Sequence, residues 1–248
     1  MALISNILNC FEPITLNEMD SVKLLNRVDT KFIYNEDKLI ALLTALKENY
    51  RVLEINGKRL CRYENLYFDS SDFKLYLQHH NGKLNRYKVR YRRYADSNLN
   101  FFEIKFKNNK QRTIKSRVKR KQISNEIQGK SEKLLTEKTP LQSDMLKPVI
   151  WVYYNRITLV NKFLPERVTI DSNIRFKSDF TEKDFPGLII AEVKQDKLQN
   201  SQAVSLMKQH HIQNVSISKY CLGVLSLNSS VKKNNFKPKL VQLKKIMR

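Results

Sequence analysis

Hydrophobic and polar residues alternate with a period of two over several short segments of this chain, as in strands with two different faces. Residues 85–94, NRYKVRYRRY, place Tyr87, Val89 and Tyr91 on one face. The other face carries four basic residues, which are Arg86, Lys88, Arg90 and Arg92. The same alternation occurs at residues 27–34, 101–107, 113–121, 152–160, 166–176 and 188–195.

The polar faces of these segments consist mostly of arginine and lysine, and several also hold one carboxylate. A strand with one charged face usually turns that face to water. Repetition of the same basic face in six or more segments instead favours a common interior. We therefore predict an α+β fold with a closed antiparallel β-barrel, whose apolar faces pack outward on flanking helices and whose charged faces line a tunnel.

Helical spacing of apolar residues predicts a helix within residues 35–50, with Asn35 as its N-cap. Shorter helices are expected at residues 70–80, 198–211 and 218–228. The segment 229–248 is polar and basic, so we expect a loosely attached, flexible tail after a single domain at residues 1–228.

Composition adds a strong charge imbalance to this picture. Among 248 residues, 46 are basic and 24 acidic, which gives a formal net charge of +22. Such an excess predicts a polyanionic partner: nucleic acid, acidic lipid or a phosphate chain. The three cysteines form no CxxC pair and indicate free thiols in a reducing compartment. With no convincing signal peptide and no apolar run long enough to span a bilayer, we expect a soluble, cytoplasmic protein.

Eight segments in order resemble the VTC domain, the polyphosphate polymerase module of the vacuolar transporter chaperone family. They are RVDTKF, YFDSSDF, NRYKVRYRRY, FFEIKFK, YNRITL, RVTIDSNIRF, IIAEVKQ and SISKYCLG. The resemblance covers about residues 20–225. Each motif alone is weak, and their order and spacing carry the match.

The resemblance implies a triphosphate tunnel fold and transfer of the ATP γ-phosphate to a growing polyphosphate chain, assisted by Mn²⁺ or Mg²⁺. Carried over by motif, the residues expected to act in catalysis are Lys31, Arg90, Lys105, Arg156 and Lys194. Those expected to bind phosphate or nucleotide are Arg27, Arg86, Lys88, Arg92, Arg117, Lys119, Tyr154, Arg167 and Lys219. Glu192 is the expected metal ligand, with Glu103 as second choice. Family members often work with a membrane-embedded subunit, so a place at the inner face of a membrane through such a partner is also implied.

One departure from the wider tunnel superfamily bears on the reaction. That superfamily begins with an ExExK motif, whereas this chain has Arg27, Asp29 and Lys31 at the matching spacing. The departure favours the polymerase branch over the triphosphatases and leaves fewer acids for metal. Phosphoryl transfer needs in-line positioning and charge neutralisation, which arginine, lysine and one metal on a carboxylate can supply.

Three other functions remain open at this point. The chain could bind polyphosphate without turning it over, since non-catalytic relatives keep a basic tunnel. It could hydrolyse triphosphate. It could bind RNA or DNA, although a surface patch would need only one or two basic strands and not many.

Several residues also have structural interpretations that need no ligand. The adjacent pairs His79-His80 and His210-His211 lack the spacing of a helical metal site and are expected at the surface. Asp69 is better explained as a helix cap than as a catalytic acid. Glu103 could pair with neighbouring lysines, Tyr154 could pack, and Asp171 could orient Arg167 or Arg175.

Overall fold

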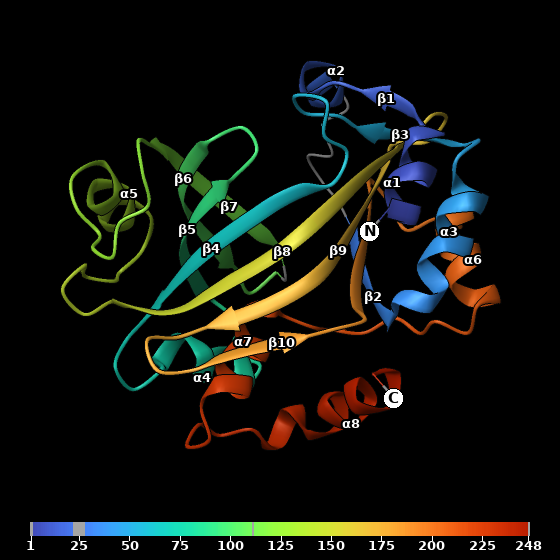
Figure 1. Cartoon of the computed structure of the whole chain (residues 1–248). Helices are drawn as coiled ribbons and strands as arrows, with labels where there is room; N and C mark the ends of the chain where they lie inside the picture. The colour runs from blue at the N-terminus through green and yellow to red at the C-terminus, as the bar shows by residue number, and fades with distance from the viewer. Residues whose placement is uncertain (1, 22–27, 111, 248) are drawn as a thin grey trace.

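The computed structural model describes residues 2–21, 28–110 and 112–247 and is shown in Figure 1. Its strands are β1 Glu12–Ile14, β2 Val28–Asn35, β3 Tyr50–Leu53, β4 Cys61–Asp69, β5 Arg86–Tyr94, β6 Leu99–Lys107, β7 Thr113–Arg120, β8 Lys147–Asn161, β9 Glu166–Lys177, β10 Glu182–Phe185 and β11 Leu188–Gln195. Its α-helices are α1 Ala2–Asn9, α2 Leu16–Ser21, α3 Leu39–Leu46, α4 Lys74–His80, α5 Lys130–Lys138, α6 Gln202–Gln209, α7 Lys219–Leu227 and α8 Lys237–Ile246. Short 3₁₀ helices, η1 Glu36–Lys38 and η2 Asn234–Phe236, precede α3 and α8.

One mostly antiparallel sheet organises the chain. Its main path runs β2-β11-β9-β8-β4-β5-β6-β7, and each neighbouring pair on this path is antiparallel. The only parallel pair among the described strands joins the short strands β1 and β3. This arrangement, with helices on the flanks of the sheet, confirms the predicted α+β class and antiparallel architecture.

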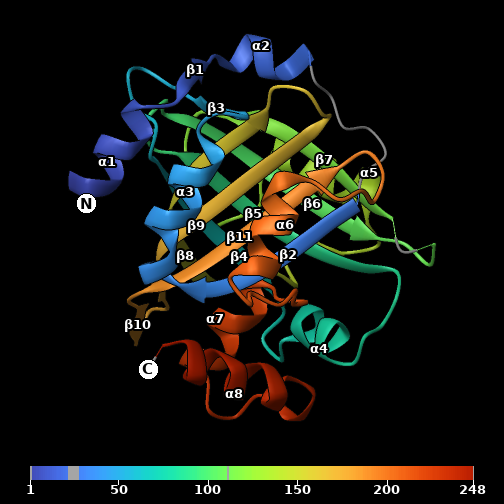
Figure 2. The same ribbon diagram turned by 90° about the vertical axis from the view of Figure 1, so that its right-hand side faces the viewer.

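The period-two alternation separates the two faces of the sheet as the sequence predicted. On the outer face, α1, α3 and α6 cover β2, β8, β9 and β11 around a core that contains Leu43, Leu159 and Ala191 (Figure 2). A second outer core gathers Val89, Tyr91 and Phe102 beneath α5. Because these apolar side chains point outward, the charged positions between them point to the concave side.

The barrel is not closed, in contrast to the closed barrel predicted from the sequence. Strands β2 and β7 stand at opposite ends of the path and do not pair with each other in the described part of the chain. The free edge of β2 has another partner: Asn214 forms a bridge with Phe32, and the Val215 amide donates to the Lys31 carbonyl at 2.8 Å. The sheet therefore forms an unclosed, tunnel-like wall whose β2 edge is covered by the segment before α7.

Helix α7 packs on the inner side of the sheet. Its residues Tyr220 and Val224 share a core with Ile150 and Phe176. A side chain at Gly223 would bring its Cβ to 2.3 Å from Ile150 Cδ1 and 2.7 Å from Phe176 Cδ1, so only glycine permits this close approach. The apolar half of the concave side is thus filled by α7, whereas the basic half is not.

Asp69 caps α4, as the sequence analysis favoured. Its carboxylate is fully buried and accepts hydrogen bonds from the amides of Leu75 (2.8 Å) and Tyr76 (2.9 Å). The Tyr220 hydroxyl donates to the same carboxylate and thereby ties α4 to α7. The helix begins at Lys74, later than expected, because Phe73 adopts a left-handed conformation with φ of 57°.

The C-terminal segment has more contacts than the loosely attached tail we expected. Residues 234–246 form η2 and α8, which pack beneath α4 and α7 (Figure 2). Phe236 and Leu243 are buried in the same core as α7, and the Asn35 side chain donates to the Ile246 carbonyl at 2.9 Å. The burial of Phe236 and Leu243 holds this basic segment against the domain. Within the described residues, no helix combines the length and apolar character needed to cross a bilayer.

Candidate phosphate-binding cavity

A cavity of about 330 Å³ lies on the concave side, between the sheet and the N-terminus of α7. Its lining includes an unusual concentration of cations, namely Lys31, Arg86, Lys88, Arg90, Arg92, Lys105, Lys107, Arg156, Lys194 and Lys219. Two carboxylates, Asp29 and Glu192, share the wall with them. The structure therefore gathers, in one place, cations contributed by β2, β5, β6, β8, β11 and α7.

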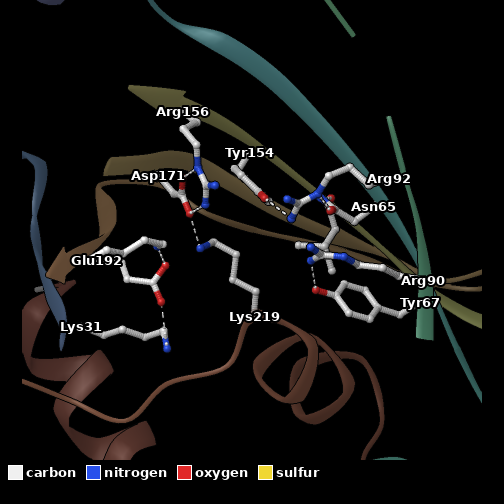
Figure 3. A network of polar contacts seen from close by, with 12 residues as sticks. Lys31, Asn65, Tyr67, Arg90, Arg92, Tyr154, Arg156, Asp171, Glu192 and Lys219 are labelled. Atoms are coloured by element: carbon white, nitrogen blue, oxygen red, sulfur yellow. Dashed lines mark hydrogen bonds and ion pairs between the residues drawn. The ribbon is translucent and has the colours of Figure 1, made fainter. Parts of the chain in front are cut away.

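On β5, the two innermost arginines are fixed by hydrogen bonds. Arg90 donates through Nε and Nη2 to Glu103 Oε2, at 3.0 and 2.6 Å. Its Nη1 donates to the Tyr67 hydroxyl at 2.7 Å (Figure 3). Arg92 donates through Nε to Asn65 Oδ1 at 2.8 Å and through Nη2 to the Tyr154 hydroxyl at 3.0 Å. These contacts use three of the five N–H donors of Arg90 and two of the five of Arg92, and they hold both guanidinium groups in place as positive charge at the base of the cavity.

Glu103 is the counter-ion of this group. Its side chain is fully buried and also forms an ion pair with Lys115, whose Nζ lies 2.5 Å from Oε1. Burial alone would raise the pKa of Glu103, but the charges of Arg90, Arg92 and Lys115 outweigh it and hold the pKa well below its usual range. Glu103 does not line the cavity, and its cation partners favour the salt-bridge interpretation over metal binding.

Asp171 organises a second group around Arg156. The guanidinium of Arg156 grips Asp171 in a bidentate pair, Nε to Oδ1 at 2.6 Å and Nη2 to Oδ2 at 2.7 Å. Lys219, the first residue of α7, donates to the same carboxylate (Figure 3). Burial would raise the pKa of Asp171, yet Arg156 and Lys219 lower it below its ordinary range. The sequence suggested that Asp171 orients Arg167 or Arg175; its observed partners are instead Arg156 and Lys219.

A third group lies on the paired strands β2 and β11. Glu192 and Lys31 are cross-strand neighbours, and Lys31 Nζ lies 3.1 Å from Glu192 Oε1. Lys194, two residues along the same face of β11, donates to the other carboxylate oxygen. Glu192 keeps 19% of its side chain exposed, in contrast to the fully buried Glu103. It is therefore a carboxylate that a ligand in the cavity can reach.

The donor set around Glu192 limits the kind of metal it could hold. The described residues contain no group of three or more His, Cys, Asp or Glu side chains placed to bind a metal ion. Mg²⁺ is commonly bound by one or two carboxylates together with substrate phosphates. Glu192 fits a metal that arrives with a phosphate ligand, and it does not fit a site built from protein ligands alone.

Three cavity lysines have weakened basicity, which are Lys88, Lys105 and Lys107, and burial is the main cause of the lowered pKa of Lys107. Burial lowers the pKa of Lys88 to about 8, and its Nζ donates to the Ser218 hydroxyl at 2.8 Å. The charge of Arg90, together with burial, lowers the pKa of Lys105 well below its usual value. So many like charges in one cavity are costly without an anion, and a polyanionic ligand would relieve that cost.

Some predicted site residues lie elsewhere. Arg117 stacks over the Phe101 ring at 4.7 Å, and Lys119 is exposed on the edge strand β7. Arg167 is the cross-strand neighbour of Lys194 but does not line the cavity. Arg27 lies outside the described residues. Tyr154 does reach the cavity, where its hydroxyl holds Arg92.

Sequence reasoning also missed a cavity residue. His79 lines the cavity, and His80 is buried with 3% exposure, so the surface position predicted for this pair is wrong. The Asn235 amide donates to His80 Nε2 at 3.2 Å, which links α4 to the C-terminal segment. The sequence did indicate the Asp69 cap of α4, but no local pattern in it signals the contact of α4 with the C-terminal segment.

Solved structures with a similar fold share little sequence with this chain. A proposed adenylate cyclase from Bacillus halodurans has 13% identity and a TM-score of 0.49, over 82% of this chain and 98% of the other. A proposed adenylate cyclase from Vibrio parahaemolyticus has 12% identity and a TM-score of 0.47, over 79% and 98%. A proposed adenylyl cyclase from Hippeastrum, described as having a dominant triphosphatase activity, has 11% identity and a TM-score of 0.48, over 81% and 96%.

No curated protein shows significant sequence similarity to the chain. The VTC domain family, however, matches residues 26–228, which span nearly all of the sheet, the cavity and α7. The match includes the basic strands β5 and β6, the Glu192 strand β11 and the Lys219 helix start. The chain therefore belongs to the VTC domain family.

Proposed function

We propose that this protein is a polyphosphate polymerase that transfers the γ-phosphate of ATP to a growing polyphosphate chain in the basic cavity. The observation that carries the proposal is the convergence of ten cations from five strands and α7 on a single cavity that also holds an accessible carboxylate, Glu192. Membership of the VTC domain family supports polyphosphate as the ligand. Because the cations face inward, the arrangement favours a narrow phosphate chain over duplex nucleic acid.

The proposed reaction is an in-line phosphoryl transfer. A terminal oxygen of the growing chain forms a bond to the γ-phosphorus while the bond from that phosphorus to the β–γ bridging oxygen breaks, and ADP leaves with the bonding electrons. Lys31, Lys194 and Arg156 lie where they can neutralise charge on the transferred group. Arg90 and Lys105 supply positive charge from the opposite wall. Little covalent chemistry is asked of the protein beyond this positioning.

Mn²⁺ or Mg²⁺, held by Glu192 and by substrate oxygens, would neutralise charge on the phosphates. The carboxylate itself supports this role, since a negative group in a phosphate cavity weakens ligand binding unless it has another purpose. For Glu192 to act in this way, Lys31 and Lys194 have to exchange the carboxylate for phosphate oxygens. Lysine ammonium groups are mobile point charges, which suits such an exchange.

A second candidate function is polyphosphate binding without turnover. It is favoured by one observation, that both oxygens of Glu192 already have lysine partners. In that case the carboxylate only balances charge between β2 and β11. The cytoplasmic location and the membrane-embedded partner implied by the resemblance stay predictions in either case.

The experiment is to incubate purified protein with ATP and Mn²⁺, or Mg²⁺, and to detect polyphosphate on a gel. The polymerase proposal predicts chains that lengthen with time and one ADP for each phosphate added. Tight binding of polyphosphate without any synthesis would support the binding module. Release of free phosphate without chain growth would indicate a triphosphatase.

A further inference from the structure

His79 occupies an unusual place at the edge of the cavity. It lies in the last turn of α4 and lines the cavity together with Arg86. Arg86 Nε donates to His79 Nδ1 at 3.1 Å, and Arg86 Nη1 donates to the Lys83 carbonyl at 2.6 Å. A ring nitrogen that accepts a hydrogen bond carries a lone pair, so the imidazole of the free protein is neutral.

Most of the titratable groups around His79 are cations. The titratable groups on the elements around it are Arg86 and Lys88 on β5, Lys107 on β6, Lys239 on α8, Cys221 on α7, Asp69 on β4, and His80 and Lys83 beside it in the chain. Asp69 is already bound by α4 amides and Tyr220. Burial, followed by Lys88, Arg86, Lys239 and Lys107, holds the pKa of His79 far below its ordinary value of 6.5.

A bound phosphate chain would offset the positive charge around His79 and would compete with its ring nitrogen for the Arg86 donor. Its negative charges offset the cations that disfavour a second ring proton. Its oxygens are also better acceptors for Arg86 than an imidazole nitrogen, because a guanidinium binds phosphate through two parallel donors. When Arg86 turns to phosphate, Nδ1 of His79 loses its donor and becomes free to take up a proton.

We propose that His79 is a proton-linked phosphate contact, which is neutral beneath Arg86 in the free protein and becomes protonated when a phosphate chain fills the cavity. This inference rests on the proposed ligand and holds for a polymerase and for a binding module alike. Protonation adds one more cation to the cavity wall. Binding of phosphate chains is therefore tighter at lower pH, because the bound state holds the extra proton.

Cavity lysines also gain protons on binding, so total proton uptake does not identify His79. Lys88, with a pKa of about 8, contributes at higher pH than a histidine does. The matched test is His79→Gln, which keeps a neutral acceptor for Arg86 and cannot take up a proton in this range. His210→Gln is the control, because His210 follows α6 and does not line the cavity.

The experiment is calorimetric titration of each protein with tripolyphosphate, without metal, between pH 8 and pH 5. Below pH 7, affinity of the wild type and of His210→Gln should rise by up to about tenfold per pH unit more than that of His79→Gln. Protonation of the ligand itself cancels in this difference. Equal pH dependence of all three proteins overturns the inference and leaves the proposed function intact, whereas no binding by the wild type removes both.

A second measurement is independent of the variant and its folding. The chain has four histidines, so imidazole ¹⁵N spectra of the wild type can be resolved. In the free protein at pH 6, the Nδ1 signal of His79 should be that of an unprotonated nitrogen, and tripolyphosphate should convert it to the imidazolium signal. An Nδ1 signal that stays unprotonated with saturating ligand at pH 5 contradicts the proposal.

Discussion

The two walls of the cavity use their carboxylates in different ways. On the β5–β6 wall, Glu103 is fully buried and satisfies Arg90 and Lys115 within the protein. On the β2–β11 wall, Glu192 is partly exposed and forms ion pairs with Lys31 and Lys194. The first wall is a completed ion network that fixes charge in place. The carboxylate of the second wall is accessible from the cavity, and for that reason we propose that metal binding and transfer take place there.

The sharpest way to test this difference is the same substitution on both walls. Glu103→Gln removes the counter-ion of buried cations and should lower the free energy of unfolding by about 3–5 kcal/mol, since uncompensated buried charge is costly. Glu192→Gln should change it by about 1 kcal/mol or less, because its lysines remain in contact with water. Urea unfolding followed by circular dichroism measures both. Equal losses from the two substitutions would show that the walls do not differ.

Asp171 is buried like Glu103, but its partners Arg156 and Lys219 both line the cavity, so we expect a loss of stability between those of Glu103→Gln and Glu192→Gln. Asp171→Asn should destabilise the fold by about 1–3 kcal/mol, the cost of unpairing a buried charged group. Tripolyphosphate should restore more thermal stability to this variant than it adds to the wild type, as ligand oxygens replace the lost carboxylate. Thermal melts with and without tripolyphosphate check this. A smaller ligand-induced rise in the variant would argue that Arg156 does not contact phosphate.

Acid pH should lower the stability that the ion pairs of Glu103 and Asp171 contribute to the fold. The pKa values of Glu103 and Asp171 are depressed in the folded protein, so their stabilisation is present above their unfolded values, near pH 4, and is lost as pH falls below them. Each contributes a slope of up to about 1.4 kcal/mol per pH unit in that window. Glu103→Gln should therefore flatten the decline in stability between pH 4.5 and pH 2. An unchanged slope, measured by urea unfolding at each pH, would contradict the assigned pairing.

Period-two alternation was enough to predict which side chains of β5, β6 and β11 face the cavity. A strand places every second residue on one side, so Arg86, Lys105 and Glu192 could be assigned from the sequence. The pairing of strands could not be assigned in this way. Whether Glu103 meets Arg90 or a metal depends on the register of β5 against β6, which is a non-local property.

The other differences between the sequence predictions and the structure also arise from contacts between residues far apart in the chain. The prediction of a closed barrel was wrong because Asn214 and Val215 pair with the edge of β2. No strand pattern in the sequence marks these two residues. The C-terminal segment packs on the domain through the buried side chains of Phe236 and Leu243. Two apolar residues in a basic segment do not form a pattern that predicts such packing from the sequence. His79 lines the cavity because of how α4 packs against the rest of the fold, and no sequence motif predicts that position.

Glu192→Gln, assayed for turnover and for ligand affinity on the same preparation, tests the assignment of chemistry to the β2–β11 wall most directly. The substitution removes the carboxylate and one negative charge while leaving Lys31 and Lys194 in place. We expect loss of metal-dependent polyphosphate synthesis from ATP, with tripolyphosphate affinity unchanged or slightly tighter because a repulsive charge is gone. Normal synthesis by Glu192→Gln would contradict the account, because the metal would then have to bind elsewhere.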